Sequence, residues 1–297
     1  MRIVLGLIVT AVWGLSFSMI KIAQETFDPL FLLVLRFVLC FLPAVFFVRR
    51  PQVPLRQLAS YGLAFGIGQF GLLFFGIKAG LSPGLASVVL QLQVFFTISF
   101  SALLLKERMT RGQVAGLVLG FAGVVMVGGI TKGTVTIVGL LLVTCAAMSW
   151  GAANVLVKRM DHADPLGLIV WSSPIPAAIL LPCSLVVEGY TSIESSVRAM
   201  DWTAFGALLF IAYPTTVIGY SVWNALLQRY ETGRVAPLTL LVPVFGLASS
   251  MLIFGERITL PKAAACGLLI LGLCVNQVSV HRRQQVPAAH RLMETQS

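Results

Sequence analysis

The sequence predicts an all-α membrane protein with ten transmembrane helices arranged as two inverted five-helix repeats. Hydrophobic residues make up 58% of the 297 residues and charged residues only 11%, which is too apolar a composition for a water-soluble surface. Apolar stretches of the roughly 20 residues that a bilayer requires recur along the chain. Short motifs also occur in both halves in the same order.

Ten apolar runs lie between clusters of charged residues, proline and glycine, and each run predicts one helix. The predicted spans are 3–23, 30–48, 58–77, 84–105, 112–130, 136–157, 167–187, 202–223, 235–254 and 262–280. The loops between them are too short to hold a soluble domain. We therefore expect a first domain at 1–130, a second at 136–280 and a polar tail at 281–297.

Lysine and arginine are unevenly distributed between alternate loops. One side of the predicted bundle carries 14 of the 21 basic residues and the other side carries 5, while Lys21 and Arg36 lie within spans. Because cytoplasmic loops are enriched in lysine and arginine, both termini and the tail are predicted to be cytoplasmic. The scattered positive charge predicts a membrane-embedded chain and no nucleic-acid partner.

Three short motifs occur once in each half. They are Trp13-Gly14 with Lys21 and Trp150-Gly151 with Lys158, Asp28-Pro29-Leu30 and Asp164-Pro165-Leu166, and Glu107-Arg108-x-Thr110 and Glu256-Arg257-x-Thr259. Five helices separate the copies, so equivalent helices must cross the membrane in opposite directions. Inverted repeats of this kind form a substrate site near the midplane and expose it alternately to the two sides. The spacing therefore predicts a transporter.

Polar and aromatic side chains inside the predicted spans are the candidate substrate-binding residues, because such groups need a partner or a water-filled cavity within a bilayer. They are Trp13, Arg36, Gln69, Gln91, Trp150 and Asn154. The Arg36 side chain could bind a carboxylate or phosphate, or could form a buried structural pair or extend to the interface. The two tryptophans could form an aromatic wall, or could only pack beside their neighbouring glycines.

The glutamine side chains of the third and fourth spans, Gln69, Gln91 and Gln93, have a structural alternative, since they could simply hydrogen-bond between helices. Gln91 and Gln93 lie about 200° apart on a helical wheel, so we do not expect both to face one cavity, and we favour Gln91. Asn154 follows Trp150 by one helical turn and is expected on the same face. Lys21 and Lys158 are either gate residues or interfacial anchors, and anchoring is favoured.

Several other functions are disfavoured by the sequence. The five cysteines form no CxxC pair, no HExxH or GxxxxGK[ST] motif occurs, and we expect no metal, cofactor or ATP site. All Asp and Glu residues fall in loops, in the tail or at span edges, so no midplane carboxylate is expected. The Gly112, Gly116 and Gly120 stripe permits close helix packing, either within one chain or in a homodimer.

Three stretches resemble the EamA family of the drug/metabolite transporter superfamily, and the resemblance covers nearly the whole chain. They are GLASVVLQLQVFFT at 84–97, KERMT at 106–110 and RYETGRVAPLTLLVP at 229–243. The resemblance implies a ten-helix inverted-repeat fold in a bacterial inner membrane, with cytoplasmic termini. It also implies export of amino acids and related metabolites, and it is closest to family members that export cysteine and O-acetylserine.

The leading hypothesis is an exporter of small zwitterionic metabolites that works by alternating access, with Arg36 binding the carboxylate. A second hypothesis is a broader efflux protein for aromatic amino acids or lipophilic cationic drugs. A third, from a different class, is a membrane enzyme or helical assembly factor. The enzyme is disfavoured because the spans contain no clustered nucleophile, base or metal ligands.

Overall fold

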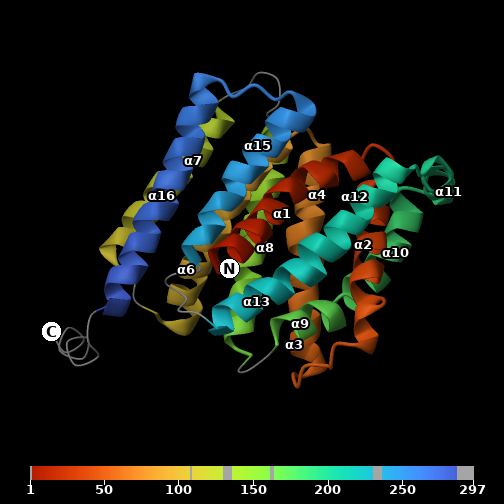
Figure 1. The fold of residues 1–297 in the computed structure, drawn as a ribbon, viewed down its shortest axis with the longest axis horizontal. Coiled ribbons are helices and arrows are strands. Elements are labelled where there is room, and N and C mark those ends of the chain that lie inside the picture. The colour runs from red at the N-terminus through yellow and green to blue at the C-terminus, as the bar shows by residue number, and fades with distance from the viewer. Residues whose placement is uncertain (1, 108, 130–135, 161–163, 230–235, 286–297) are drawn as a thin grey trace.

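The computed structural model describes residues 2–107, 109–129, 136–160, 164–229 and 236–285, and all regular structure in these ranges is helical (Figure 1). The first half contains α1 (Arg2–Ala23), α2 (Pro29–Phe41), the 3₁₀ turn η1 (Ala44–Phe46), α3 (Leu55–Tyr61), the π-helix η2 (Gly62–Gly71), α4 (Leu72–Lys78), α5 (Pro83–Val89), the 3₁₀ turn η3 (Leu90–Leu92), α6 (Gln93–Leu105) and α7 (Arg111–Gly128).

The second half has a similar mixture of regular and irregular helices. It contains α8 (Ile137–Lys158), α9 (Pro165–Ser172), α10 (Pro174–Val187), α11 (Tyr190–Ala199), α12 (Trp202–Ala212), the π-helix η4 (Tyr213–Ile218), α13 (Gly219–Arg229), the 3₁₀ segment η5 (Ala236–Leu241), α15 (Val242–Phe254) and α16 (Leu260–Gln285). The polar start of the predicted tail extends α16 to Gln285, and residues 286–297 and Arg108 lie outside the described residues.

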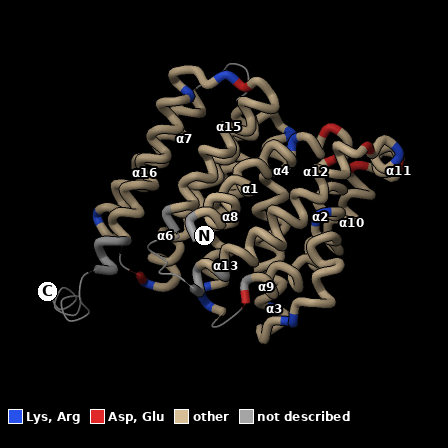
Figure 2. The backbone as a smooth tube through the Cα atoms, in the orientation of Figure 1, with Lys and Arg blue, Asp and Glu red and all other residues tan. Residues whose placement is uncertain are grey.

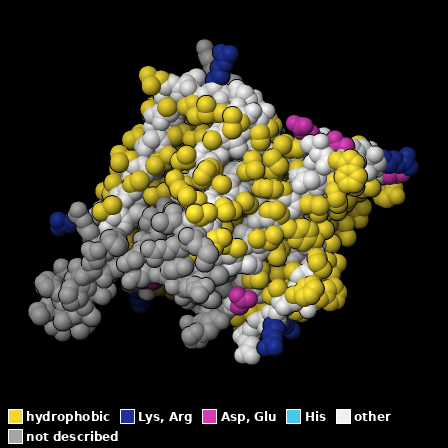
Figure 3. Space-filling view, in the orientation of Figure 1, with side chains coloured by type: hydrophobic (Ala, Val, Ile, Leu, Met, Phe, Trp, Pro, Cys, Tyr) yellow, Lys and Arg dark blue, Asp and Glu magenta, His cyan; other side chains and the backbone are white. Residues whose placement is uncertain are grey.

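The outer surface and the helix lengths both indicate a multi-pass membrane protein. Nine helices in the described residues are long and apolar enough to cross a bilayer, and the shorter apolar helix Leu238–Phe254 occupies the place of the ninth predicted span. Charged residues gather at the helix ends (Figure 2), and hydrophobic side chains cover most of the described surface in view (Figure 3). Val125, Val186 and Leu252 are 75%, 84% and 86% exposed, as suits contact with lipid.

One predicted loop is a helix. The segment 188–201 lies between the seventh and eighth predicted spans, and within it residues Tyr190–Ala199 form α11. The segment is polar, so it gave no hydrophobic run by which it could be recognised. Its Ser192 hydroxyl donates to Asp28 Oδ2 at 2.6 Å, which ties this short helix to the start of α2.

Four spans contain a change of helical type, three of them inside the span and the fourth at the start of the ninth span. η2 and η4 are π-helices within the third and eighth spans, whereas η3 and η5 are 3₁₀ segments within the fourth and ninth. Pro214 accounts for η4, because proline has no N–H to donate to the preceding turn. The Thr216 hydroxyl instead donates to the Ile211 carbonyl, five residues earlier, at 2.9 Å. Such π-turns often occur at functional sites.

The glycine of each Trp-Gly pair lies at a close helix contact. A Cβ atom on Gly14 of α1 would lie 2.5 Å from the Cβ of Phe245 in α15. A Cβ atom on Gly151 of α8 would lie 2.7 Å from the Cβ of Phe96 in α6. These contacts are too short for any side chain, so packing explains both glycines.

The glycine stripe of α7 packs within the chain. α7 and α16 lie side by side (Figure 1) and make the most extensive helix contact in the described structure. A Cβ atom on Gly116 would lie 2.6 Å from the Gly272 carbonyl oxygen of α16. The stripe is therefore used inside one protomer and no longer argues for a homodimer, which stays a prediction.

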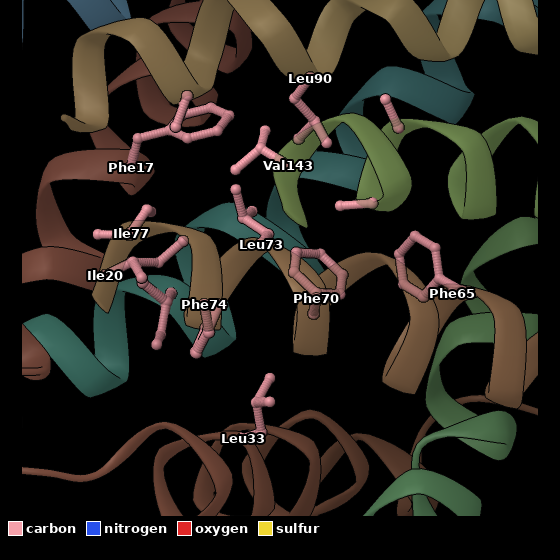
Figure 4. Packing of buried hydrophobic residues seen from close by; sticks show 14 of the residues in the cluster. Phe17, Ile20, Leu33, Phe65, Phe70, Leu73, Phe74, Ile77, Leu90 and Val143 are labelled. Atoms are coloured by element: carbon pink, nitrogen blue, oxygen red, sulfur yellow. The ribbon is translucent and has the colours of Figure 1, made fainter. Parts of the chain in front are cut away.

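The main hydrophobic core collects buried side chains from most of the spans, the second span included. Figure 4 shows Phe17 of α1, Phe70 of η2, Leu73 of α4 and Leu90 of η3 converging from three spans. All four also line the cavity described next. The core thus forms part of the cavity wall and holds the irregular helices in place around it.

Candidate substrate cavity

A single cavity of about 280 Å³ collects side chains from the helices of both halves. Its volume lies just below the roughly 300–1,000 Å³ of pockets for drug-sized ligands, so it suits a smaller molecule. All six predicted candidates line it: Trp13, Arg36, Gln69, Gln91, Trp150 and Asn154. Residues that the sequence did not single out also line it, among them Ser16, Thr215 and Trp223.

Arg36 is buried in the wall of this cavity at 1% exposure. Its guanidinium donates to Thr216 Oγ1 at 2.9 Å, and its Cζ atom lies 3.6 Å from the centre of the Phe70 ring. Within the described ranges, no carboxylate forms an ion pair with Arg36. The Arg36 charge is therefore not neutralised by a buried ion pair with a described residue. Its side chain also does not extend to the membrane interface, since it is 1% exposed.

Unsatisfied polar atoms are concentrated at the cavity. Four buried side-chain atoms in the described residues lack a hydrogen-bond partner, and three of them belong to cavity residues: Arg36 Nε, Gln69 Oε1 and Thr215 Oγ1. The fourth, Asn276 Oδ1, is on α16. Since buried polar atoms are normally paired, the unpaired atoms of Arg36, Gln69 and Thr215 make these cavity-lining residues candidates to bind a ligand.

The irregular helices place these groups. Gln69 and Phe70 belong to the π-helix η2, and Thr215 belongs to the π-helix η4. The Trp13 indole donates to the Thr215 carbonyl at 2.9 Å, which joins α1 to η4.

Gln91 and Gln93 both line the cavity, so the expectation that they would not is wrong. The reason is the 3₁₀ turn η3, which ends immediately before Gln93. A 3₁₀ helix turns about 120° per residue. Viewed along the helix axis, residues two positions apart therefore point about 120° apart by the shorter route, compared with about 160° in an α-helix. The Gln91 amide donates to the Thr239 carbonyl at 3.0 Å.

Asn154 is held by an amide network between α8 and α6. Its Nδ2 donates to Gln93 Oε1 at 2.8 Å and to Thr97 Oγ1 at 3.0 Å. Asn154 therefore lines the cavity while both its donors are used between helices. Interhelical hydrogen bonds thus occupy both N–H donors of Asn154, and only its side-chain carbonyl oxygen remains for other contacts.

Aromatic rings form another part of the wall. The Trp13 ring lies 5.2 Å from Tyr220 and 5.3 Å from Trp223, measured between ring centres, in tilted arrangements. Trp150 lines the cavity from α8. These rings offer the cavity apolar area and negative faces that can contact a cation.

The two repeated lysines lie near the helix ends and do not line the cavity. Lys158 pairs with Glu107 at 3.3 Å and donates to Ser101 Oγ at 3.1 Å, which links α8 to the end of α6. The Lys21 ammonium lies 4.4 Å from the centre of the Phe254 ring, at the end of α15. Each lysine therefore contacts the helix against which its own Trp-Gly pair packs.

Comparison with known proteins decides the family. The sequence model of the EamA-like transporter family matches residues 1–129 and 137–277. The chain belongs to the EamA-like transporter family. It is therefore a membrane transporter and not an enzyme, as its resemblance to the EamA family implied.

Two curated relatives, both named "Probable amino-acid metabolite efflux pump", support this membership. The Salmonella typhimurium protein is 43% identical over 92% of this chain and 93% of its own length, and the Escherichia coli protein is 40% identical over 95% and 97%. A solved crystal structure with 19% identity aligns with a TM-score of 0.64, covering 95% of this chain and 98% of that one, so the two share a fold.

Proposed function

We propose that this transporter exports small zwitterionic amino-acid metabolites, cysteine and O-acetylserine among them, across the bacterial inner membrane. The observation that carries the proposal is a buried Arg36 on the cavity wall, with an unpartnered Nε and no carboxylate partner in the described residues. A buried charge is costly unless it is compensated. A substrate carboxylate would supply the missing charge and could accept two hydrogen bonds from the guanidinium.

The size of the cavity and the names of the relatives support the same substrate class. A volume of about 280 Å³ suits a small metabolite better than a large drug. The two curated relatives, which are 43% and 40% identical to this chain, are both named as probable amino-acid metabolite efflux pumps. Cysteine and O-acetylserine are small zwitterions that fit this description.

Alternating access between two inverted repeats, each with five of ten spans, is part of the proposal. An offset of 149 residues carries Gly62–Gly71 onto the region of η4 and Leu90–Leu92 onto the region of η5, so each half has one π-helix and one 3₁₀ turn in equivalent spans. The recurrence supports domains at 1–130 and 136–280. Inverted repeats provide two exchangeable arrangements around one site.

In this scheme Lys158 and Lys21 are equivalent gate residues. With both termini in the cytoplasm, the Lys158–Glu107 ion pair would close the cytoplasmic ends of α8 and α6. Lys21 would occupy the external end of α1, beside Phe254. Opposite placement of equivalent lysines is what an inverted repeat requires.

The aromatic wall favours a second candidate function, efflux of aromatic amino acids. Trp13, Tyr220 and Trp223 form one contiguous group of rings, and Phe70 and Trp150 add further faces. Lipophilic cations fit less well, because no Asp or Glu among the described residues lines the cavity and Arg36 would repel them.

Counterflow in proteoliposomes tests the proposal. Proteoliposomes that contain the purified protein and are preloaded with unlabelled cysteine should accumulate labelled cysteine or O-acetylserine above the level of protein-free vesicles. Comparing transport with and without a proton gradient should reveal any coupling. Uptake of labelled phenylalanine alone would establish the second candidate instead. Absence of counterflow for every amino acid would refute both.

A further inference from the structure

We infer that Gln69 and Thr215 form an ammonium-binding subsite beside Arg36, so that the transporter selects molecules carrying an amino group next to a carboxylate. This inference rests on the proposed export of zwitterions and deepens it. The sequence marked Gln69 only as a cavity residue, and it did not mark Thr215 at all.

The first support is the chemistry of the unsatisfied atoms. Gln69 and Thr215 are 2% and 6% exposed, and their Oε1 and Oγ1 atoms have no hydrogen-bond partner. An amide oxygen only accepts hydrogen bonds, so Gln69 Oε1 requires a donor from the ligand. A carboxylate supplies none, whereas an ammonium group supplies three N–H donors.

The second support is position, because Gln69 and Thr215 line the same cavity as Arg36. Gln69 precedes Phe70, whose ring lies 3.6 Å from the Arg36 Cζ atom. Thr215 precedes Thr216, whose hydroxyl accepts from Arg36 at 2.9 Å. The carboxylate and ammonium groups of an α-amino acid are attached to the same carbon, so a site for one needs a site for the other alongside it.

The third support is the balance of charge. No Asp or Glu of the described chain lines this cavity, so Arg36 is its only charged side chain there. An amine without a carboxylate would therefore meet an uncompensated positive charge. A carboxylate without an amine would leave Gln69 Oε1 unpaired, and a site built around a hydrogen bond strongly rejects an analogue that lacks it. A zwitterion satisfies both conditions.

Competition among three matched thiols tests the subsite. Full-length protein in liposomes is assayed for counterflow of labelled O-acetylserine in the presence of cysteine, 3-mercaptopropionate, which lacks the amine, or cysteamine, which lacks the carboxylate. Wild-type protein should be inhibited about 10- to 100-fold better by cysteine than by either analogue, as loss of one charge-assisted hydrogen bond predicts. Gln69→Leu and Thr215→Val should weaken inhibition by cysteine by a similar factor and should leave inhibition by 3-mercaptopropionate nearly unchanged.

Two further variants keep the test decisive. Gln69→Glu adds a carboxylate to the subsite and should strengthen inhibition by cysteamine, a gain that misfolding cannot produce. Thr10→Val is the matched control, because the Thr10 hydroxyl is satisfied within α1 by the Gly6 and Leu7 carbonyls and does not line the cavity. It should leave all three inhibition constants unchanged.

The outcomes separate this inference from the proposed function. If wild-type protein shows no counterflow of amino acids, the proposed function fails. If wild-type protein prefers cysteine but Gln69→Leu and Thr215→Val weaken cysteine and 3-mercaptopropionate equally, or weaken neither, the ammonium subsite is refuted while zwitterion export stands. Failure of Gln69→Glu to improve cysteamine also counts against the subsite.

Discussion

Replacing Arg36 by methionine removes the charge on which the proposed carboxylate site depends. Methionine retains an unbranched apolar chain beside the Phe70 ring but has no donor. A hydrogen bond to a charged group contributes about 1.5–3 kcal/mol. At about 1.4 kcal/mol per tenfold, Arg36→Met should raise the KM for a zwitterionic substrate by about 10- to 150-fold.

The same substitution should cost little stability, which separates a binding role from a structural one. Thr216 keeps its hydrogen bond to the Ile211 carbonyl at 2.9 Å after the guanidinium is lost. Contact between the cation and the Phe70 ring, worth about 0.5–2 kcal/mol, is offset by removal of a charge whose insertion at a helix centre costs about 2.5–3.5 kcal/mol. We expect an equal or higher melting temperature in detergent.

The assay combines counterflow kinetics with thermal unfolding of the same preparation. Arg36→Lys is the matched comparison, because it keeps the charge but loses the planar fork that binds a carboxylate through two bonds. Its KM should lie between those of the wild type and Arg36→Met. A KM for Arg36→Met within about threefold of wild type, or a large loss of stability with an unchanged KM, would show that Arg36 is structural.

Three further predictions concern the ends and edges of the bundle. Lys158→Glu should increase the access of cysteine reagents at the ends of α8 and α6 that the ion pair joins, and adding Glu107→Lys should restore closure; the pair is half exposed, so the effect is about 0.2–1 kcal/mol. Glu256→Gln removes a buried carboxylate that accepts from two serines and a lysine and should lower unfolding stability by up to about 3–5 kcal/mol. Gly116→Val should clash with the Gly272 backbone and cost about 1–3 kcal/mol in thermal unfolding without changing the KM.

The membrane spans could be predicted because each depends on local composition. An apolar run of sufficient length predicts a helix whatever surrounds it, and the predicted boundaries agree with the described ones within a few residues. Pro214 gives η4 a local cause in the sequence, but η2 and η3 contain no proline and could not be predicted. In η2 a Cβ atom on Gly66 would lie 2.6 Å from the Pro176 side chain of α10, a contact between distant parts of the chain. α11 was missed because it is polar and lies between spans.

The cavity residues were partly predictable for a physical reason. Arg36 and Gln69 are too polar for a lipid-facing position, so their presence in apolar runs already indicated an interior site. Thr215 gave no such indication, because a threonine in a membrane helix normally bonds to its own backbone. Only the structure shows that the Thr215 hydroxyl, in the π-helix η4, has no hydrogen-bond partner. Gln93 was misjudged because a helical wheel assumes one α-helix throughout the span.

The two ends of the bundle make different ionic contacts although the turns that close them are alike. Lys106 and Gly255 both adopt left-handed backbone conformations, with φ of 56° and 63°, at the ends of α6 and α15. Yet Lys158 forms an ion pair with Glu107, which follows Lys106, whereas Lys21, its equivalent in the proposed repeat, lies against Phe254. Two symmetric transport states would exchange these contacts, and one conformation of an alternating-access transporter must break that symmetry. The different contacts of Lys158 and Lys21 are therefore what one asymmetric conformation of such a transporter would show.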